Sequence, residues 1–93
     1  MIKLVQITRE GPSAYRLHNI YLNPKHIIFM SEHAAYKHDL MEGKMNLNID
    51  KKASFTKIKI SENSGFSEIT VVGDPSTVES KIYKDSKRRL LKS

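Results

Sequence analysis

The chain has 93 residues, of which 39% are hydrophobic and 28% are charged, which is the size and composition of one folded domain spanning 1–93. It contains no cysteine, which excludes disulfides, cysteine-ligated metal centres and thiol nucleophiles. Because no apolar run reaches the length of a bilayer span and the first residues lack the pattern of a signal peptide, we expect a cytoplasmic protein with no membrane partner.

The net charge of +6 is concentrated near the C-terminus. Residues 81–93 carry a charge of +5, with Asp85 as their one acidic residue, whereas residues 1–80 carry +1. A basic end of this kind, which we take as a tail over 84–93, either contacts an acidic partner or only keeps the chain solvated. The basic residues of 81–93 are Lys81, Lys84, Lys87, Arg88, Arg89 and Lys92.

Three strands are predicted in the first third of the chain, because β-branched and apolar residues there are separated by turn residues. Gly11 and Pro12 favour a turn after the first strand, and Pro24 ends the second. The apolar spacing slips by one at His18–Asn19, which indicates a bulge. The predicted strands are Ile2–Thr8, Tyr15–Leu22 and His26–Met30.

Residues 31–54 form a polar stretch that we interpret as an inserted, mobile segment. Ser31 and the residues after it favour a short helix to about Met41, which Gly43 ends. Asn46–Lys52 alternates two apolar residues with polar ones, which is typical of a marginal edge strand or a flap.

The last third predicts a hairpin followed by a helix. Strands are expected at Phe55–Ile60 and Phe66–Val72, joined by a five-residue loop, Ser61–Gly65. Asp74 as the cap with proline next predicts one helix start, and a capping box beginning at Ser76 predicts a competing one. The helix can continue into the basic tail.

Together these elements predict an α+β fold: a small, twisted antiparallel sheet of about five strands with a C-terminal helix across one face. Phe29, Phe55 and Phe66 are interpreted as core aromatics. The other expected core residues are Ile2, Leu4, Leu17, Leu22, Ile27, Ile58, Ile60, Ile69, Val71, Val78 and Ile82.

Two stretches carry a family resemblance: MIKL at the start with Tyr21–Pro24 (YLNP) and Ile27, and Thr70–Val78 (TVVGDPSTV) after a strand, a turn and a second strand. Over residues 1–30 and 55–83 the chain resembles the FlbD-like small flagellar and swarming proteins. The resemblance implies a compact sheet with a short helix, and it supplies no catalytic residue. The chain differs from that family in 31–54, in the Gly-Pro turn and in the basic tail. Similar compact sheets occur in small bacteriophage proteins, a second candidate source.

No phosphate-loop, dinucleotide-binding, zinc-protease, calcium-loop or nucleophile-elbow motif is present, so we expect no catalytic residue, no cofactor and no metal. His33 and His38 are candidate metal ligands by type. On a helix, however, side chains five residues apart point about 140° away from each other. We therefore interpret both as exposed polar residues.

We expect a binding function rather than an enzyme, and three hypotheses remain open. The first is a regulatory module, such as a bacteriophage or bacterial effector, that contacts a protein partner through His33, Tyr36, Lys37, His38 and Asp39. The second is RNA or DNA binding by Lys81, Lys84, Lys87, Arg88, Arg89 and Lys92. The third is a small anionic ligand, such as a nucleotide, held at the helix start by Gly73, Ser76 and Thr77.

Overall fold

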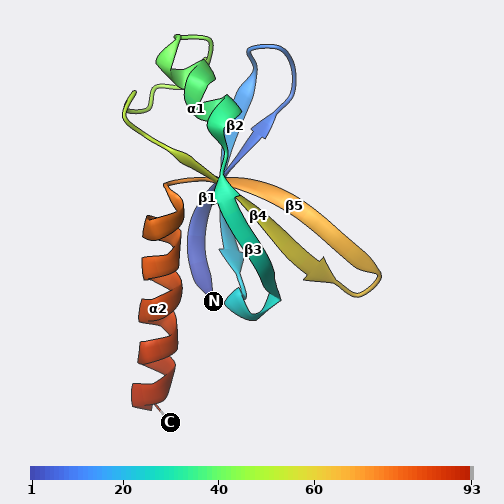
Figure 1. Cartoon of the computed structure of the whole chain (residues 1–93), viewed down its shortest axis with the longest axis vertical. Coiled ribbons are helices and arrows are strands. Elements are labelled where there is room, and N and C mark those ends of the chain that lie inside the picture. Colours follow the sequence, from blue (N-terminus) through green and yellow to red (C-terminus); the bar gives the residue numbers. More distant parts are fainter. Residues whose placement is uncertain (93) are drawn as a thin grey trace.

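The computed structural model describes the backbone of residues 1–92 and the side chains of residues 1–87. In this part of the chain five strands form one antiparallel sheet, accompanied by two α-helices and a 3₁₀ turn (Figure 1), which confirms the predicted α+β fold. In chain order the elements are β1 (Ile2–Arg9), β2 (Tyr15–Leu22), η1 (Pro24–His26), β3 (Ile27–Glu32), α1 (Ala34–Met41), β4 (Phe55–Glu62), β5 (Gly65–Val72) and α2 (Pro75–Lys92).

The sheet has the order β2-β1-β5-β4-β3. It consists of two regions, β1 with β2 and β3 with β4 and β5, which are joined by a short contact between β1 and β5. β1 and β2 pair along eight positions, as do β4 and β5. β1 and β5 pair only at Gln6 with Val71 and at Ile7 with Thr70. Because only these two residue pairs join the two regions, the sheet twists strongly between them. The two hairpins accordingly diverge in Figure 1.

Two local predictions about the strands are wrong. The pairing of β1 with β2 is continuous, so no bulge occurs at His18–Asn19; the register shift lies in β3, between Ile27 and Phe29. The β4–β5 turn is also tighter than the expected Ser61–Gly65 loop, because the strands continue to Glu62 and resume at Gly65. Gly65 has a φ of 153°, a conformation that L side chains rarely adopt, so this short turn depends on glycine.

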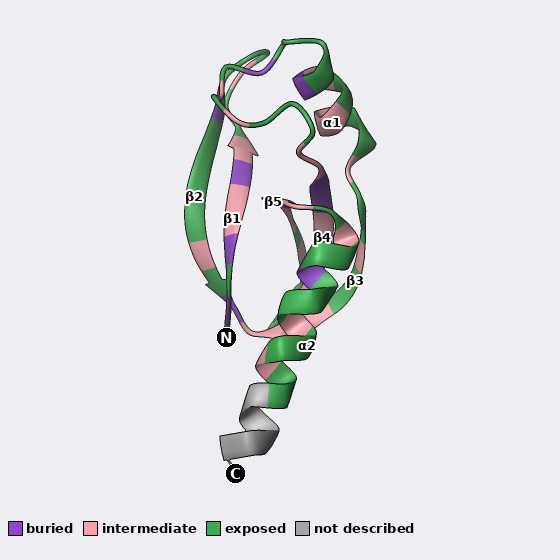
Figure 2. Cartoon of the chain, turned by 90° about the vertical axis from the view of Figure 1, so that its left-hand side faces the viewer, coloured by how far each residue is buried: buried purple, intermediate pink, exposed green. Residues whose placement is uncertain are grey.

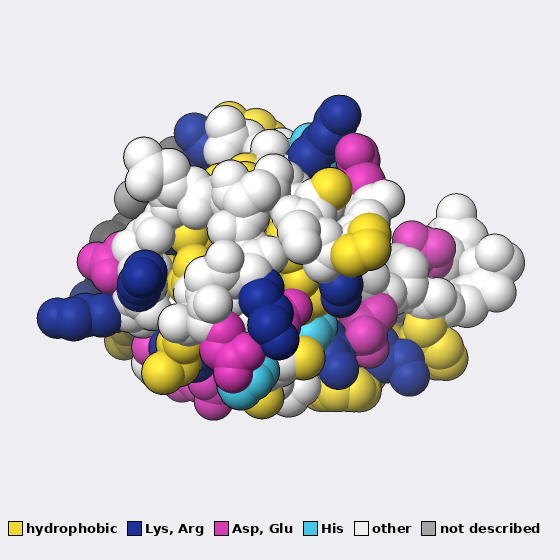
Figure 3. All heavy atoms as spheres, turned by 90° about the horizontal axis from the view of Figure 1, so that it is seen from above, with side chains coloured by type: hydrophobic (Ala, Val, Ile, Leu, Met, Phe, Trp, Pro, Cys, Tyr) yellow, Lys and Arg dark blue, Asp and Glu magenta, His cyan; other side chains and the backbone are white. Residues whose placement is uncertain are grey.

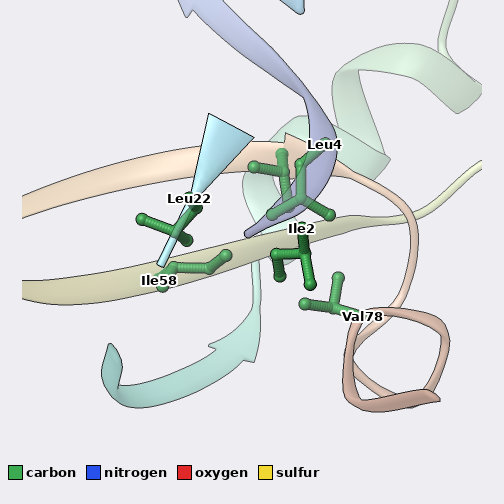
Figure 4. Close-up of a cluster of buried hydrophobic side chains, with 6 residues drawn as sticks. Ile2, Leu4, Leu22, Ile58 and Val78 are labelled. Carbon is green, nitrogen blue, oxygen red and sulfur yellow. The ribbon is translucent and has the colours of Figure 1, made fainter. Parts of the chain in front are cut away.

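α2 covers one face of the sheet, which we call the covered face. Six buried side chains meet there, and Figure 4 shows Val78 of α2 directed at Ile2 and Ile58. Asp74 caps the helix: its Oδ1 accepts a hydrogen bond from the backbone N–H of Thr77 at 2.7 Å. This confirms the Asp74 start, and the helix backbone continues into the basic tail as expected. The buried cluster is Ile2, Leu4, Leu22, Ile58, Val71 and Val78.

A second buried cluster lies on the other side of the sheet, under α1 and the loop that follows it. Leu40 and Met45 are 4% and 8% exposed, so the segment 31–54 contributes two side chains to the core, while its predicted mobility stays a prediction. α1 begins at Ala34, capped by the His33 side chain, and residues 46–52 form no strand. Figure 2 shows buried positions in β1, β4 and both helices. This cluster consists of Ile7, Tyr15, Leu40, Met45 and Phe55.

Three predicted core residues are on the surface: Leu17, Phe29 and Phe66 are 39%, 49% and 67% exposed. Phe55 is fully buried, as predicted. The remaining predicted core residues are buried or half-buried. No helix within the described residues has both the length and the apolar character needed to cross a membrane.

Candidate functional site

The side of β3, β4 and β5 that faces away from α2 carries exposed aromatic side chains and half-buried basic ones. In an antiparallel sheet, residues directly opposite each other point to the same face. Phe29 of β3 lies opposite Lys59 of β4, which in turn lies opposite Glu68 of β5. We call this surface the open face. It consists of Phe29 and Ser31 of β3, Lys57, Lys59 and Ser61 of β4, and Phe66 and Glu68 of β5.

The centre of the open face is the ammonium group of Lys59, which lies between two exposed aromatic rings. Its Nζ is 4.9 Å from the ring centroid of Phe66 and 5.7 Å from that of Phe29. A cation over a ring is attracted by the ring's negative face, by about 0.5–1 kcal/mol at exposed sites. The contact therefore orders Lys59 while much of both rings stays accessible. Figure 3 shows hydrophobic and basic side chains side by side over the β4–β5 hairpin.

His33 and Tyr36 border the open face at its α1 end. Their rings stack with centroids 3.9 Å apart, and His33 Nδ1 accepts a hydrogen bond from the Tyr36 backbone N–H at 3.3 Å. Burial, followed by the positive charge of Lys57, lowers the pKa of His33 below its ordinary value of 6.5. His33 is therefore uncharged at neutral pH, and the positive charge of this surface comes from Lys57 and Lys59.

The other residues predicted to contact a protein partner are tied into the fold. Lys37 Nζ donates to the Ala53 carbonyl at 3.1 Å, which fastens α1 to the chain before β4. His38 pairs with Glu42 at 2.9 Å. The Tyr15 hydroxyl donates to Asp39 at 2.8 Å; burial, followed by this bond, raises the pKa of Tyr15 to about 12. Lys37 and Asp39 therefore hold α1 in place, and His38 is the exposed member of the set.

The basic residues of α2 fall into two groups. Lys81 and Lys84 line a small cavity together with Lys3, at the start of β1. Lys87 is exposed on the following turn. The side chains of Arg88, Arg89 and Lys92 lie outside the described residues, so their part of the nucleic-acid prediction stays untested.

The start of α2, predicted as an anion site, already contains a carboxylate. Asp74 Oδ1 accepts from Ser76 Oγ at 3.1 Å as well as from the Thr77 N–H, and these hydrogen bonds lower the pKa of Asp74. The Gly73 N–H donates to the Ser54 carbonyl at 2.7 Å. An anion arriving at Gly73, Ser76 and Thr77 would have to displace these bonds, so the geometry does not favour a ligand there.

Phe29 and Phe66 are the open-face residues that the sequence interpretation missed. For Phe66 a signal was available: Ile69 and Val71 are inward-facing positions of β5, and Phe66 has the opposite parity. Phe29 was hidden by the register shift in β3. Without that shift it would share a face with Ile27, which packs against the covered cluster.

No family model matches the chain, and no curated protein or solved structure is significantly similar to it. The resemblance to FlbD-like proteins over residues 1–30 and 55–83 accordingly stays a prediction. So does the alternative of a bacteriophage source. The open face is therefore interpreted through its own geometry and charge.

Proposed function

We propose that this protein is a non-enzymatic module that binds single-stranded nucleic acid on the open face of its sheet. The observation that carries the proposal is the position of Lys59 between the exposed rings of Phe29 and Phe66. Bases stack on exposed aromatic rings, and lysines hold the phosphates between them. Both groups are present on one surface, within reach of successive nucleotides.

The shape and charge of this surface support a single strand over a duplex. The rings lie on a sheet face, where unpaired bases can lie flat against them, whereas a base inside a duplex presents only its edge. Among the residues that define the open face, Lys57 and Lys59 are basic and Glu68 alone is acidic, so the face has an excess of positive charge. A strand crossing β3, β4 and β5 can thus place bases on the rings and phosphates near the lysines.

The same composition argues against a protein partner on this face. The centres of protein interfaces are enriched in aromatic residues but depleted in lysine, because burying an ammonium group without a paired charge is costly. Here Lys59 is at the centre and both rings contact it. A phosphate backbone supplies the negative charge that this arrangement lacks, while the ammonium group stays in contact with water.

The test is the binding of a fluorescently labelled, mixed-sequence single-stranded oligonucleotide, measured by anisotropy at several salt concentrations. Replacing one stacking ring by alanine costs about 1–3 kcal/mol. Phe29→Ala and Phe66→Ala should therefore each weaken binding by about fivefold or more. Lys59→Gln should lower the log–log salt slope by about 0.7, because one phosphate of the single strand is then no longer neutralised.

Tyr83→Ala is the matched control, because Tyr83 on α2 is 66% exposed, almost the same as Phe66, but lies off the open face. It should bind as the wild type does. The proposal is wrong if the wild type does not bind single strands, or if the Phe29→Ala/Phe66→Ala double variant keeps wild-type affinity.

The prediction of a protein partner at 31–54 is a separate hypothesis, and one observation supports it: Met41 on α1 is 61% exposed, next to the exposed His38. A Met41→Ala/His38→Ala variant should reduce capture of such a partner from a nuclease-treated lysate. It should leave oligonucleotide affinity unchanged, because neither residue belongs to the open face. Equal capture by the variant and the wild type would contradict this hypothesis.

A further inference from the structure

β2 is an edge strand of the sheet. It pairs with β1 along all eight of its residues, and the sheet order places no strand on its other side. Figure 2 shows β2 at the margin of the molecule, and most of its residues are exposed. An edge strand presents unpaired N–H and C=O groups that can bind a further strand, so natural sheets usually protect their edges.

The opposite edge, β3, carries such a protection, whereas β2 does not. Bulges, prolines and lysines on the edge strand are the usual devices. The register of β3 shifts between Ile27 and Phe29, but the pairing of β2 is continuous. The sequence of β2 contains neither proline nor lysine. β2 is therefore the edge that can accept another strand.

The hydrogen bonds near β2 show which of its backbone groups point outward. The Tyr15 N–H donates to Asn46 Oδ1 at 2.8 Å and is therefore directed away from β1. Along an antiparallel strand, residues alternate between bonding to the neighbouring strand and pointing outward. The outward residues that follow Tyr15 in β2 are Leu17, Asn19 and Tyr21.

These three residues form a free stretch with an occupied backbone group at each end. Their outward N–H and C=O groups have no hydrogen-bond partner in the part of the chain that the structure describes. Before them, the Tyr15 N–H is bonded to Asn46. After them, the Asn23 carbonyl accepts a hydrogen bond from the His26 N–H at 3.0 Å. A strand that pairs with β2 is therefore limited to the free stretch for its backbone bonds.

The free stretch also carries two apolar side chains that the fold leaves uncovered. Tyr21 lies opposite Lys3 of β1. Lys3 alternates with Ile2 and Leu4 of the covered face, so Tyr21 points away from α2. Leu17, four residues earlier, points to the same side as Tyr21. Their side chains are 39% and 66% exposed, and they flank Asn19 symmetrically.

We propose that β2 pairs antiparallel with β2 of a second copy of this chain, with Asn19 opposite Asn19. Leu17 of each copy then lies opposite Tyr21 of the other, so the exposed side chains cover each other on both sides of the two-fold axis. Outward residues that lie opposite each other exchange both backbone bonds. The pairing therefore uses the whole free stretch and neither of its occupied ends.

The neighbouring registers would require occupied groups. An axis at His18 would bring Tyr15 into the pairing, although the Tyr15 N–H is already bonded. An axis at Ile20 would bring in Asn23, although the Asn23 carbonyl is already bonded. The register centred on Asn19 avoids both conflicts.

The charges of β2 permit this pairing. Its one lysine or arginine is Arg16, which is paired with Glu10 at 2.9 Å within the same chain. In the proposed register Arg16 lies opposite Leu22 of the second copy, so the two arginines are about 20 Å apart along the strands. That separation exceeds the screening length of about 10 Å at 0.1 M salt, so the arginines do not oppose the contact.

The test is sedimentation equilibrium of the full chain over a range of protein concentrations. The wild type should approach twice the chain mass of 10.7 kDa. Leu17→Glu/Tyr21→Glu places carboxylates opposite each other and should raise the dimer dissociation constant by about tenfold or more. Leu17→Lys/Tyr21→Glu places opposite charges at the same positions and should dimerise about fivefold more tightly than the first variant. A wild type that stays monomeric would overturn the proposal and leave this edge to a strand of a different protein.

Ile28→Glu/Met41→Glu is the matched control, because these side chains are 46% and 61% exposed and lie outside β2. It should dimerise as the wild type does. Equal weakening by the control and by Leu17→Glu/Tyr21→Glu would show an effect of net charge alone and would overturn the proposal. So would equal dissociation constants for the two β2 variants.

A second measurement needs no variant. Amide hydrogen exchange of the wild type, followed by NMR at low and high protein concentration, should slow at Leu17, Asn19 and Tyr21 as the dimer forms. Exchange at Tyr15 should stay the same, because its N–H is bonded within the chain. Exchange that is independent of concentration at all three residues would contradict the pairing. Neither measurement involves nucleic acid, so the proposal does not depend on the open face.

Discussion

The two faces of β4 differ sharply although their residues alternate along one strand. Ile58, on the covered face, is fully buried in the same cluster as Val78 of α2. Lys57 and Lys59, its neighbours on the open face, are half-buried among the side chains of β3 and β5. The same backbone thus supports a packed core on one side and an accessible ring–lysine surface on the other.

This difference indicates where the fold needs its stability and where it has surface available for binding. Two buried clusters pack against the sheet, one under α2 and one under α1. The part of β3–β5 that neither helix covers retains two exposed phenylalanines, which contribute little to either cluster. Large apolar side chains that leave the core and gather on one surface are typical of an interaction site.

The largest expected effect is the difference in stability between alanine variants of two phenylalanines. Phe55 is fully buried, so Phe55→Ala should lower the free energy of unfolding by about 3–5 kcal/mol. Phe66 is 67% exposed, so Phe66→Ala should change it by about 0.5 kcal/mol or less. Urea denaturation of both variants measures the difference. A Phe66→Ala effect as large as that of Phe55→Ala would show that the open face is part of the core.

The sequence predicted the β4–β5 pairing correctly because that pairing follows a local pattern. Alternation puts Ile58 on the covered face, and its pairing with Ile69 follows. Gly-Asp-Pro located the start of α2, because the capping chemistry is local. These features depend on neighbours in the chain, which the sequence displays.

The misplaced features depend on contacts between distant segments. Leu40 and Met45, which were not predicted as core residues, pack in one cluster with Tyr15, which is far away in the chain. The shift between Ile27 and Phe29 reversed the parity of β3 and moved Phe29 to the open face. The candidate site therefore emerged only when the register of three strands was known.

A smaller effect is expected from the bond that ties α1 to β2. Tyr15→Phe removes the hydroxyl that donates to Asp39 and should lower the free energy of unfolding by about 1–3 kcal/mol. Tyr21→Phe, at an exposed ring, is the control and should have almost no effect. Because the pKa of Tyr15 is raised to about 12, its contribution is present below pH 10 and is lost as the pH rises from 10 to about 12. Denaturation curves that are identical for Tyr15→Phe and Tyr21→Phe would contradict this role.

The smallest expected effect is on the pH dependence of stability and concerns His33, which caps α1 beside the open face. Its pKa is lowered by burial and by Lys57, while a backbone hydrogen bond, Glu68 and Asp39 act in the opposite direction. The folded state therefore binds its proton less readily than the unfolded state, so the stability contributed by neutral His33 is present above pH 6.5 and is lost as the pH falls below it. Melting temperatures measured from pH 8 to pH 5 should fall more steeply for the wild type than for His33→Gln. Parallel curves would mean that His33 titrates alike in both states, and that its stacking on Tyr36 leaves it as solvated as an exposed histidine.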